Sequence, residues 1–231
     1  MSADAASNGP LVRCDGVART FGSGRTATVA LQPATCVVPE GARIALVGRS
    51  GSGKSTLVHI MAGLDAPTGG RIAWPAIGGR ADLRPGRVAV VLQGPSLLAP
   101  LTVLENAALP LILGGAGDKR ARQAAITALR HAGVDELAEK LPEEISSGQA
   151  QRVAVARALA GRPRLILADE PTGQLDHDAA ATVVELLLSA ADHAGAGLVV
   201  STHDPVVADR LADVWQMHSG RLTSHDRVGV S

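Results

Sequence analysis

A glycine-rich loop, Gly48-Arg-Ser-Gly-Ser-Gly-Lys-Ser-Thr56, constrains the fold of this chain more than any other feature. The apolar run 44–47 before it is typical of a buried strand, and the segment from Ser55 to about Ala62 after it predicts a helix. A strand that runs through a tight loop into a helix is the building unit of parallel α/β proteins. The loop therefore predicts an α/β fold whose ligand site lies at the carboxyl ends of the strands.

The chemistry of this loop favours phosphate. Its residues fit G-x-x-x-x-G-K-[ST] between a strand and a helix, where glycines let backbone N–H groups close around phosphate oxygens and the helix N-terminus adds positive potential. Lys54 would reach the β- and γ-phosphates, and the Ser55 hydroxyl would bind Mg²⁺. An ordinary glycine-rich turn is the alternative, and the flanking pattern disfavours it. The predicted phosphate-binding residues are Gly48, Arg49, Ser50, Gly51, Ser52, Gly53, Lys54, Ser55 and Thr56.

A second motif, made of two acidic residues, lies where a metal ligand is needed. The apolar strand Leu165-Ile-Leu-Ala ends in Asp169 and Glu170. Asp169 at the strand tip would lie near the Mg²⁺, as in P-loop nucleoside triphosphatases, and Glu170 could orient an attacking water. Two adjacent acids could instead mark a solvated helix N-terminus. Together with the glycine loop, they favour nucleotide hydrolysis.

Composition limits the remaining possibilities. The 231 residues fit one compact unit with a subdomain, and 22 basic residues balance 22 acidic ones, which disfavours nucleic acid as a partner. Two cysteines at no metal-ligand spacing and the absence of a secretory signal favour a cytoplasmic protein. The apolar segment 95–117 contains Pro100, Glu105, Asn106 and Pro110, which argue against a membrane span.

Strands alternate with helices along the chain, which predicts a mostly parallel sheet. The expected strands are 11–14, 28–31, 35–38, 44–47, 69–74, 87–92, 164–169 and 197–201, and the expected helices include 55–62, 118–132, 178–193 and 206–212. The pattern between residues 102 and 161 is helical. The middle of the chain is therefore expected to form a helical insertion.

With these motifs in place, the chain resembles the nucleotide-binding subunits of ABC transporters over residues 11–222. Ile145-Ser-Ser-Gly-Gln149, followed by AQRVAVARAL, is similar to the family's LSGGQ signature and its helix. Ser147 replaces the usual glycine, which adds a side chain where the resemblance implies that backbone approaches phosphate. The match is specific because the segment lies between the two phosphate-site motifs.

Further residues match the family in order along the chain. Gln93 resembles the glutamine that contacts the metal and the water, Asp176 in Gly173-Gln-Leu-Asp resembles the residue that reaches across a dimer, and His203 resembles the histidine that binds the γ-phosphate. Phe21 occupies the position of the aromatic ring that stacks on adenine. The other histidines, including His59, His131 and His218, show no ligand spacing and are given no role.

The resemblance implies an ABC-type P-loop fold: a mostly parallel core sheet, an N-terminal antiparallel β subdomain and an inserted helical subdomain at about 94–162. Residues 1–10 and 223–231 are expected to be tails. The implied catalytic residues are Glu170, His203, Lys54 and Gln93; the implied metal ligands are Ser55, Gln93 and Asp169; the further nucleotide contacts are Phe21, Ser146, Gly148, Gln149 and Asp176. The implied activity is Mg²⁺-dependent ATP hydrolysis.

The resemblance also implies partners. Two copies would bind head to tail, with each ATP between Lys54 of one and the signature residues of the other, and would drive a separate integral-membrane permease at the inner face of the membrane. We expect the apolar stretch Pro95–Leu113, directly after Gln93, to form part of the permease contact, although Leu97, Leu98, Leu101 and Leu104 could simply pack the helical subdomain.

Three segments narrow the resemblance within the family. Gly63–Thr68, Leu101–Asn106 and Glu170–Asp176 are most similar to the branch that serves lipoprotein release, macrolide export and the cell-division complex. Two other classes stay open: an ABC-type ATPase that acts on ribosomes or DNA, and a P-loop kinase of small metabolites. A length of one cassette and zero net charge disfavour an ATPase that acts on ribosomes or DNA. A small-metabolite kinase would not need the ISSGQ segment, so its presence disfavours that class.

Overall fold

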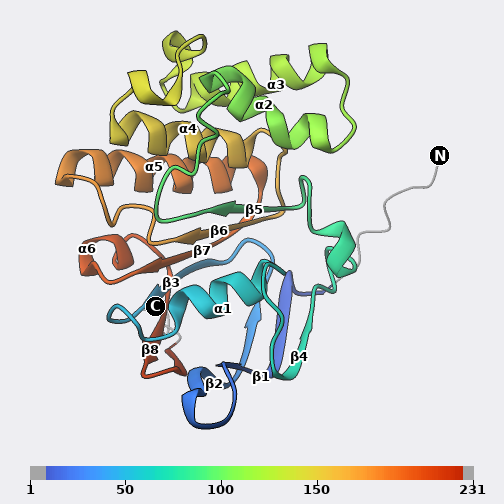
Figure 1. Cartoon of the computed structure of the whole chain (residues 1–231), viewed down its shortest axis with the longest axis vertical. Coiled ribbons are helices and arrows are strands. Elements are labelled where there is room, and N and C mark those ends of the chain that lie inside the picture. Colours follow the sequence, from blue (N-terminus) through green and yellow to red (C-terminus); the bar gives the residue numbers. More distant parts are fainter. Residues whose placement is uncertain (1–8, 226–231) are drawn as a thin grey trace, which may run out of the picture.

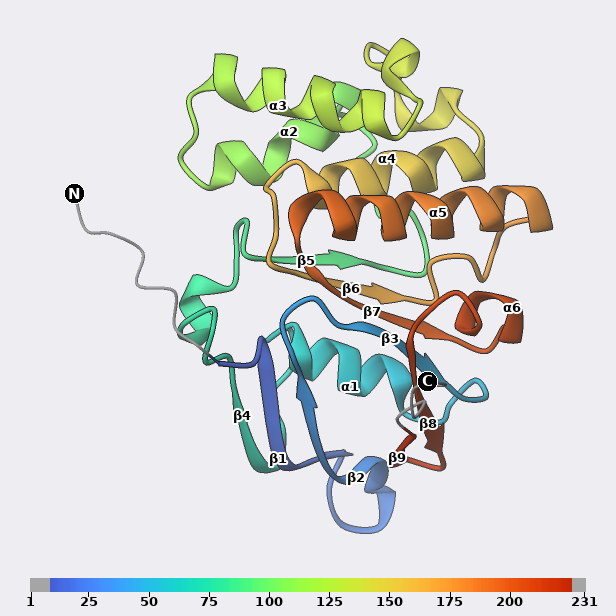
Figure 2. The same cartoon turned by 180° about the vertical axis from the view of Figure 1, so that it is seen from behind.

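The computed structural model describes residues 9–225, and its main element is a six-stranded sheet (Figure 1, Figure 2). The strand order is β5 (Val88–Val91), β6 (Leu165–Asp169), β7 (Gly197–Thr202), β3 (Arg43–Val47), β8 (Asp213–His218) and β9 (Arg221–His225). Every neighbouring pair is parallel except β8 and β9. The carboxyl ends of β3, β6 and β7 therefore meet at one edge, which confirms the mostly parallel core expected from the sequence.

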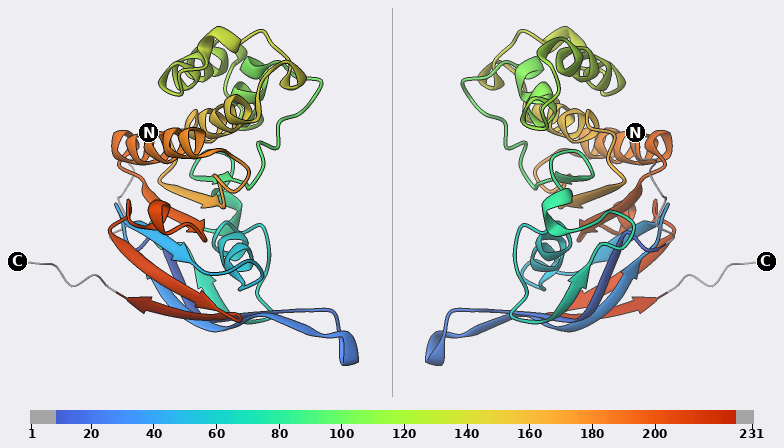
Figure 3. Two further views of the ribbon diagram at one scale, coloured as in Figure 1. Left: turned by 90° about the vertical axis from the view of Figure 1, so that its left-hand side faces the viewer. Right: turned by 90° about the vertical axis from the view of Figure 1, so that its right-hand side faces the viewer.

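A second sheet of three antiparallel strands lies below the first in Figure 1. Its order is β2 (Thr28–Val38), β1 (Val12–Phe21) and β4 (Gly69–Ala73). The expected short strands 11–14, 28–31 and 35–38 were wrong in extent, because register shifts between β1 and β2 keep both strands continuous through residues that interrupt the apolar pattern. The turn between β1 and β2 projects away from the body of the molecule (Figure 3).

Helices cover the two faces of the six-stranded sheet. Helix α1 (Lys54–Met61) lies on the side of the antiparallel sheet, and α5 (His177–Ala194) lies on the opposite side (Figure 1). One hydrophobic core joins α1 to β1, β2, β3 and β6, and a second joins α5, α6 (Pro205–Ala208) and α4 (Ser147–Leu159) to the other face. The strands β6 and β7 are buried along their whole length, as expected for parallel strands with helices on both faces.

A helical layer forms the end of the molecule farthest from the antiparallel sheet (Figure 3). It consists of α2 (Val103–Leu113), α3 (Asp118–His131) and α4 (Ser147–Leu159), which share a hydrophobic core of their own. Helix α4 also contributes Val155 to the core under α5. Short 3₁₀ segments lie at Gly24–Thr26, Arg80–Asp82, Asp135–Leu137 and Pro142–Glu144.

Three boundaries differ from the sequence interpretation. Strand β9 runs to His225, past the expected end of the domain at Leu222, and neither β8 nor β9 was predicted. Helix α6 ends at Ala208 instead of residue 212, because the chain turns there and buries Leu211. The Pro10 carbonyl accepts a hydrogen bond from Ala76, and the rest of the expected N-terminal tail, 1–8, lies outside the described residues, as do 226–231.

Within 9–225, no helix combines the length and apolarity needed to cross a membrane.

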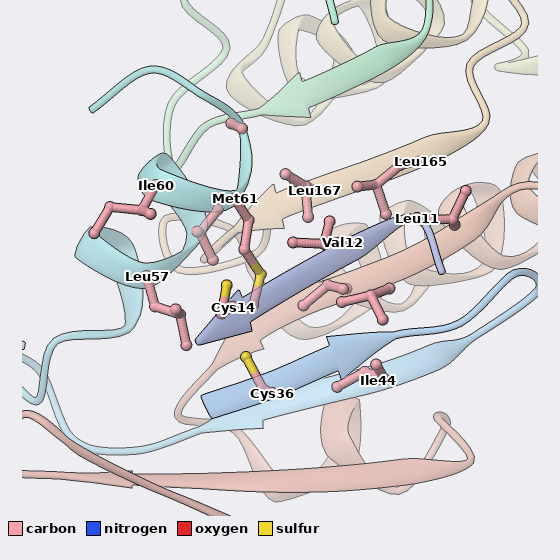
Figure 4. Packing of buried hydrophobic residues seen from close by; sticks show 14 of the residues in the cluster. Leu11, Val12, Cys14, Cys36, Ile44, Leu57, Ile60, Met61, Leu165 and Leu167 are labelled. Atoms are coloured by element: carbon pink, nitrogen blue, oxygen red, sulfur yellow. The ribbon is translucent and has the colours of Figure 1, made fainter. Parts of the chain in front are cut away.

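The two cysteines lie opposite each other on β1 and β2, inside the core beneath α1 (Figure 4). Both are free thiols. The hydrogen bond with Cys36, together with burial, raises the pKa of the Cys14 thiol. Because the thiolate is the reactive form, the raised pKa makes Cys14 unreactive, and burial shields Cys36 from reagents.

We expect the native protein to react with a thiol reagent such as iodoacetamide at least about tenfold more slowly than the urea-unfolded chain, because both thiols are buried in the core and must be exposed before the reagent can reach them. Intact-protein mass spectrometry over a time course measures the rate. A free-cysteine peptide under the same conditions is the control. Rapid native labelling would contradict this account of the core.

Candidate functional site

The glycine loop links β3 to α1, and its neighbours leave no room for a side chain at Gly48 or Gly53. A Cβ atom on Gly48 would lie 2.3 Å from the Met217 carbonyl oxygen, and one on Gly53 would lie 2.5 Å from the Ala30 carbonyl oxygen. Gly53 also has φ +102°, which favours glycine. Gly48 and Gly53 are therefore required by packing against β8 and β2, whereas a Cβ on Gly51 would meet no atom within 4 Å.

Lys54 is a buried cation at the centre of this loop, with 4% of its surface exposed. Its Nζ donates to the carbonyl oxygens of Gly48 (2.7 Å) and Arg49 (3.1 Å) and lies 3.0 Å from Glu170 Oε1. These partners offset the cost of burying an ammonium group. The charge is held where an incoming anion would meet it.

Asp169 ends β6 and is also buried. Its Oδ1 accepts from the hydroxyl of Ser201 (2.6 Å) and from that of Ser55 (3.0 Å), while Oδ2 lies 3.6 Å from His59 Nε2. The parallel register pairs Asp169 with Ser201, so the two side chains meet across β6 and β7. A carboxylate and a hydroxyl at this distance are the hard oxygen donors that Mg²⁺ takes.

Glu170 connects the buried lysine to a surface histidine. Its carboxylate contacts Lys54 through Oε1 and His203 Nδ1 through Oε2 (2.8 Å). Its backbone has φ +46°, which is strained for a residue with a side chain. Two hydrogen bonds from the Glu170 N–H, to the Ser201 carbonyl (3.1 Å) and hydroxyl (3.0 Å), hold this conformation. With this backbone conformation the Glu170 carboxylate faces Lys54 and His203. The neighbouring Asp169 carboxylate faces Ser55 and Ser201 instead.

Gln93 and Phe21 are both exposed. The Gln93 side chain is close enough to Gly173 that a Cβ there would lie 3.4 Å from Gln93 Nε2, but within residues 9–225 no hydrogen bond joins Gln93 to Ser55 or Asp169. The Phe21 ring is 45% exposed, and the Arg19 guanidinium lies 4.5 Å from its centroid. A cation on one face leaves the other face of the ring open for stacking.

The signature residues form the start of α4. Ser146 and Gln149 make a reciprocal capping box, in which Gln149 N–H donates to Ser146 Oγ (3.2 Å) and Ser146 N–H donates to Gln149 Oε1 (2.9 Å). Ser147 is exposed in the first turn, and a Cβ on Gly148 would lie 3.3 Å from Ala179. No hydrogen bond between these side chains and the glycine loop is found in the described chain.

Asp176 likewise has a local partner. It is the N-cap of α5 and accepts a hydrogen bond from the Ala179 N–H (2.9 Å). The structure thus brings together the glycine loop, Asp169, Glu170 and His203, and it leaves Gln93, Phe21, Asp176 and the signature residues outside that cluster.

The sequence interpretation missed two members of the cluster. Ser201 bonds to both neighbouring acids, and His59 faces Asp169. The position of Ser201 at the end of an apolar strand marks it as a residue of the sheet edge, but its pairing with Asp169 is not encoded in that position. His59 could have been found from its spacing of four residues after Ser55 on the predicted helix.

Comparisons with known proteins agree with this geometry. The ABC transporter family matches residues 31–173. The dimeric ATP-binding cassette MJ0796 in a post-hydrolysis state with ADP and Pi is 33% identical, with a TM-score of 0.82 over 93% of this chain and 98% of that one. Another dimeric structure of MJ0796, described as a bacterial ABC transporter cassette, is 34% identical with a TM-score of 0.83 and the same coverage.

A third solved structure is cbiO1 from Clostridium perfringens, part of the ABC transporter complex cbiONQ. It is 26% identical, with a TM-score of 0.79 over 93% of this chain and 87% of that one. The fold and the phosphate-site cluster define an ABC-type P-loop ATPase. The chain belongs to the ABC transporter family, in which it is an ATP-binding and ATP-hydrolysing subunit.

We expect Ser201→Ala to lower the free energy of unfolding by about 1–3 kcal/mol, because the buried Asp169 carboxylate loses a hydrogen-bond donor. Urea unfolding followed by circular dichroism measures the change. Ser96→Ala, which removes an exposed hydroxyl, is the matched control. Equal stabilities of the two variants would show that the Ser201 contact contributes nothing.

Proposed function

We propose that this chain works as a head-to-tail homodimer that couples Mg²⁺-dependent ATP hydrolysis to a separate integral-membrane permease at the cytoplasmic face of the membrane. The main support for ATP hydrolysis is a continuous series of contacts from Lys54 through Glu170 to His203. The hydrogen-bonded Ser55–Asp169 pair belongs to the same site. It combines a phosphate-binding cation, a carboxylate and an imidazole at the edge where parallel strands end.

The donor set fits Mg²⁺. Ser55 Oγ and Asp169 Oδ1 lie 3.0 Å apart, and a hydroxyl and a carboxylate are hard oxygen donors of the kind that Mg²⁺ takes. Ser55, Asp169 and, after a movement of its segment, Gln93 would hold the ion. When bound, Mg²⁺ would neutralise charge on the phosphate oxygens.

The chain's own residues supply the remaining steps. Lys54 would exchange its contacts with the loop carbonyls and Glu170 for phosphate oxygens, which frees the Glu170 carboxylate to polarise the attacking water. His203 is 62% exposed and carries its ring beside that carboxylate, so it can hydrogen-bond the γ-phosphate while orienting Glu170. The backbone N–H groups of residues 48–56 would bind the other phosphate oxygens, and Phe21 would stack on adenine.

The dimer completes the site. Ser147 is exposed, and the side chains of Ser146 and Gln149 bond only to each other's backbone N–H in the described chain, so this helix N-terminus is available to a nucleotide held by another copy. Asp176, at the N-terminus of α5, would reach the same interface. The cassette MJ0796, a relative at 33% identity, is dimeric with ADP and Pi bound.

The permease contact is proposed on the exposed part of the stretch 95–113. Leu104 is buried in the helical core and Leu97 packs against it, whereas Leu98, Ile112 and Leu113 are exposed. The fully buried Asn106 fixes this segment by accepting from the Leu98 N–H and donating to the Leu98 and Leu101 carbonyls. Exposed apolar side chains on a rigid backbone are typical of a partner site. The relative cbiO1 belongs to a transporter complex.

We expect Glu170→Gln to lower ATP turnover by about 10²-fold or more while keeping nucleotide binding, because the amide cannot polarise water. Phosphate release measures turnover, and gel filtration with ATP should show an accumulated dimer. Lys54→Ala is the comparison variant, in which nucleotide binding itself should be lost. Wild-type turnover in Glu170→Gln would remove Glu170 from the catalytic residues.

We expect Leu98→Asp to leave ATP binding unchanged and to detach the protein from membranes that contain its permease, because a carboxylate would replace apolar contact area. Co-sedimentation with those membranes measures the effect. Leu64→Asp is the matched control, since Leu64 has a similar exposure (48% against 46%) outside the stretch. Equal membrane binding of the two variants would place the contact elsewhere.

A further inference from the structure

The two oxygens of the Asp169 carboxylate have unequal surroundings. Oδ1 accepts from two hydroxyls, those of Ser201 and Ser55. Oδ2 has His59 Nε2 at 3.6 Å, a separation within ion-pair range and beyond a hydrogen bond. The orientation of the carboxylate is therefore fixed on one side only.

His59 reaches this carboxylate from the same helix as Ser55. The two residues are separated by one turn of α1, so their side chains share a face. The ring is 37% exposed as a whole, yet Nε2 is buried and has no hydrogen-bond partner. A buried ring nitrogen without a partner costs free energy, and Asp169 Oδ2 is the acceptor that lies in front of it.

We propose that His59 is a positioning residue for the metal site: its Nε2–H donates to Asp169 Oδ2 and holds the carboxylate in place when the site is loaded. This inference rests on the proposed function, in which Ser55 and Asp169 hold Mg²⁺. A movement of about 0.5 Å brings the two atoms into hydrogen-bond range. Ligating carboxylates are commonly held by such outer hydrogen bonds, whose loss weakens metal affinity about 10–100-fold.

The neutral ring is sufficient for this role. With the proton on Nε2, the neutral imidazole is a donor toward Asp169, and Nδ1 is an acceptor. The backbone carbonyl of His59 accepts from the N–H groups of Leu64 and Asp65, and those contacts do not use the ring. Substitution of the side chain therefore leaves the end of α1 intact.

The test separates a donor at the Nε2 position from a ring that only fills space. The variants are His59→Leu, His59→Gln and His59→Asn. The amide nitrogen of glutamine reaches about as far as Nε2, whereas that of asparagine reaches only as far as Nδ1. Two binding measurements avoid any dependence on turnover: Mn²⁺ affinity of the ADP complex by electron paramagnetic resonance, and ADP affinity in EDTA by calorimetry.

We expect His59→Leu and His59→Asn to weaken Mn²⁺ binding by about tenfold or more, and His59→Gln to stay within about threefold of wild type. ADP affinity in EDTA should be unchanged in all three. Wild-type Mn²⁺ affinity in His59→Leu overturns the inference and leaves the metal site standing. Equal losses with and without metal also overturn it, since they assign the ring to packing. Failure of the wild-type ADP complex to bind Mn²⁺ overturns the metal site itself, and the inference with it.

Discussion

The buried ammonium of Lys54 is the interaction on which the site depends. A cation with 4% exposure is stable only with several acceptors, and two of them are carbonyls of its own loop while the third is Glu170. Glu170 can reach Lys54 because β6, β7 and β3 are adjacent and parallel, which ends all three strands at one edge. The strained φ of Glu170 and its hydrogen bonds to Ser201 follow from the same arrangement. Phosphate would compete for an ammonium that is already paired, so binding and rearrangement of Glu170 are linked.

The helical layer is tied to the site by α4. At its start lie the signature residues, and along its length Gln151, which is 2% exposed, donates to the Leu92 carbonyl (3.2 Å) next to Gln93. Arg157 donates to the Ser96 (2.8 Å) and Pro95 (3.3 Å) carbonyls, and burial lowers its pKa. One rigid helix thus holds both the segment after Gln93 and the proposed dimer contact. The helix is packed into two hydrophobic cores, so one continuous element joins these two regions.

The sequence was sufficient where chemistry is local. The glycine loop and the acids at the end of β6 are short segments whose spacing sets their geometry, and the alternation of strands and helices predicted the parallel core. Contacts that depend on strand register could not be predicted. Ser201 meets Asp169 because those two residues are paired across β6 and β7, and no pattern in one sequence gives that pairing. The strands β1 and β2 were underestimated because bulges break the alternation of apolar residues.

In the apolar stretch after Gln93, the sequence could not separate buried leucines from exposed ones. Leu97, Leu98 and Leu101 lie between β5 and α2, outside any helix or strand, so no period of hydrophobicity could separate core from surface there. The deciding residue is Asn106, whose side-chain amide satisfies the backbone of that irregular segment from inside the helical core. A buried amide with four hydrogen bonds fixes the loop, because each backbone group it serves would otherwise need water. The exposure of Leu98 is therefore a consequence of Asn106, and a polar residue in the middle of an apolar run determines which leucines remain available to a partner.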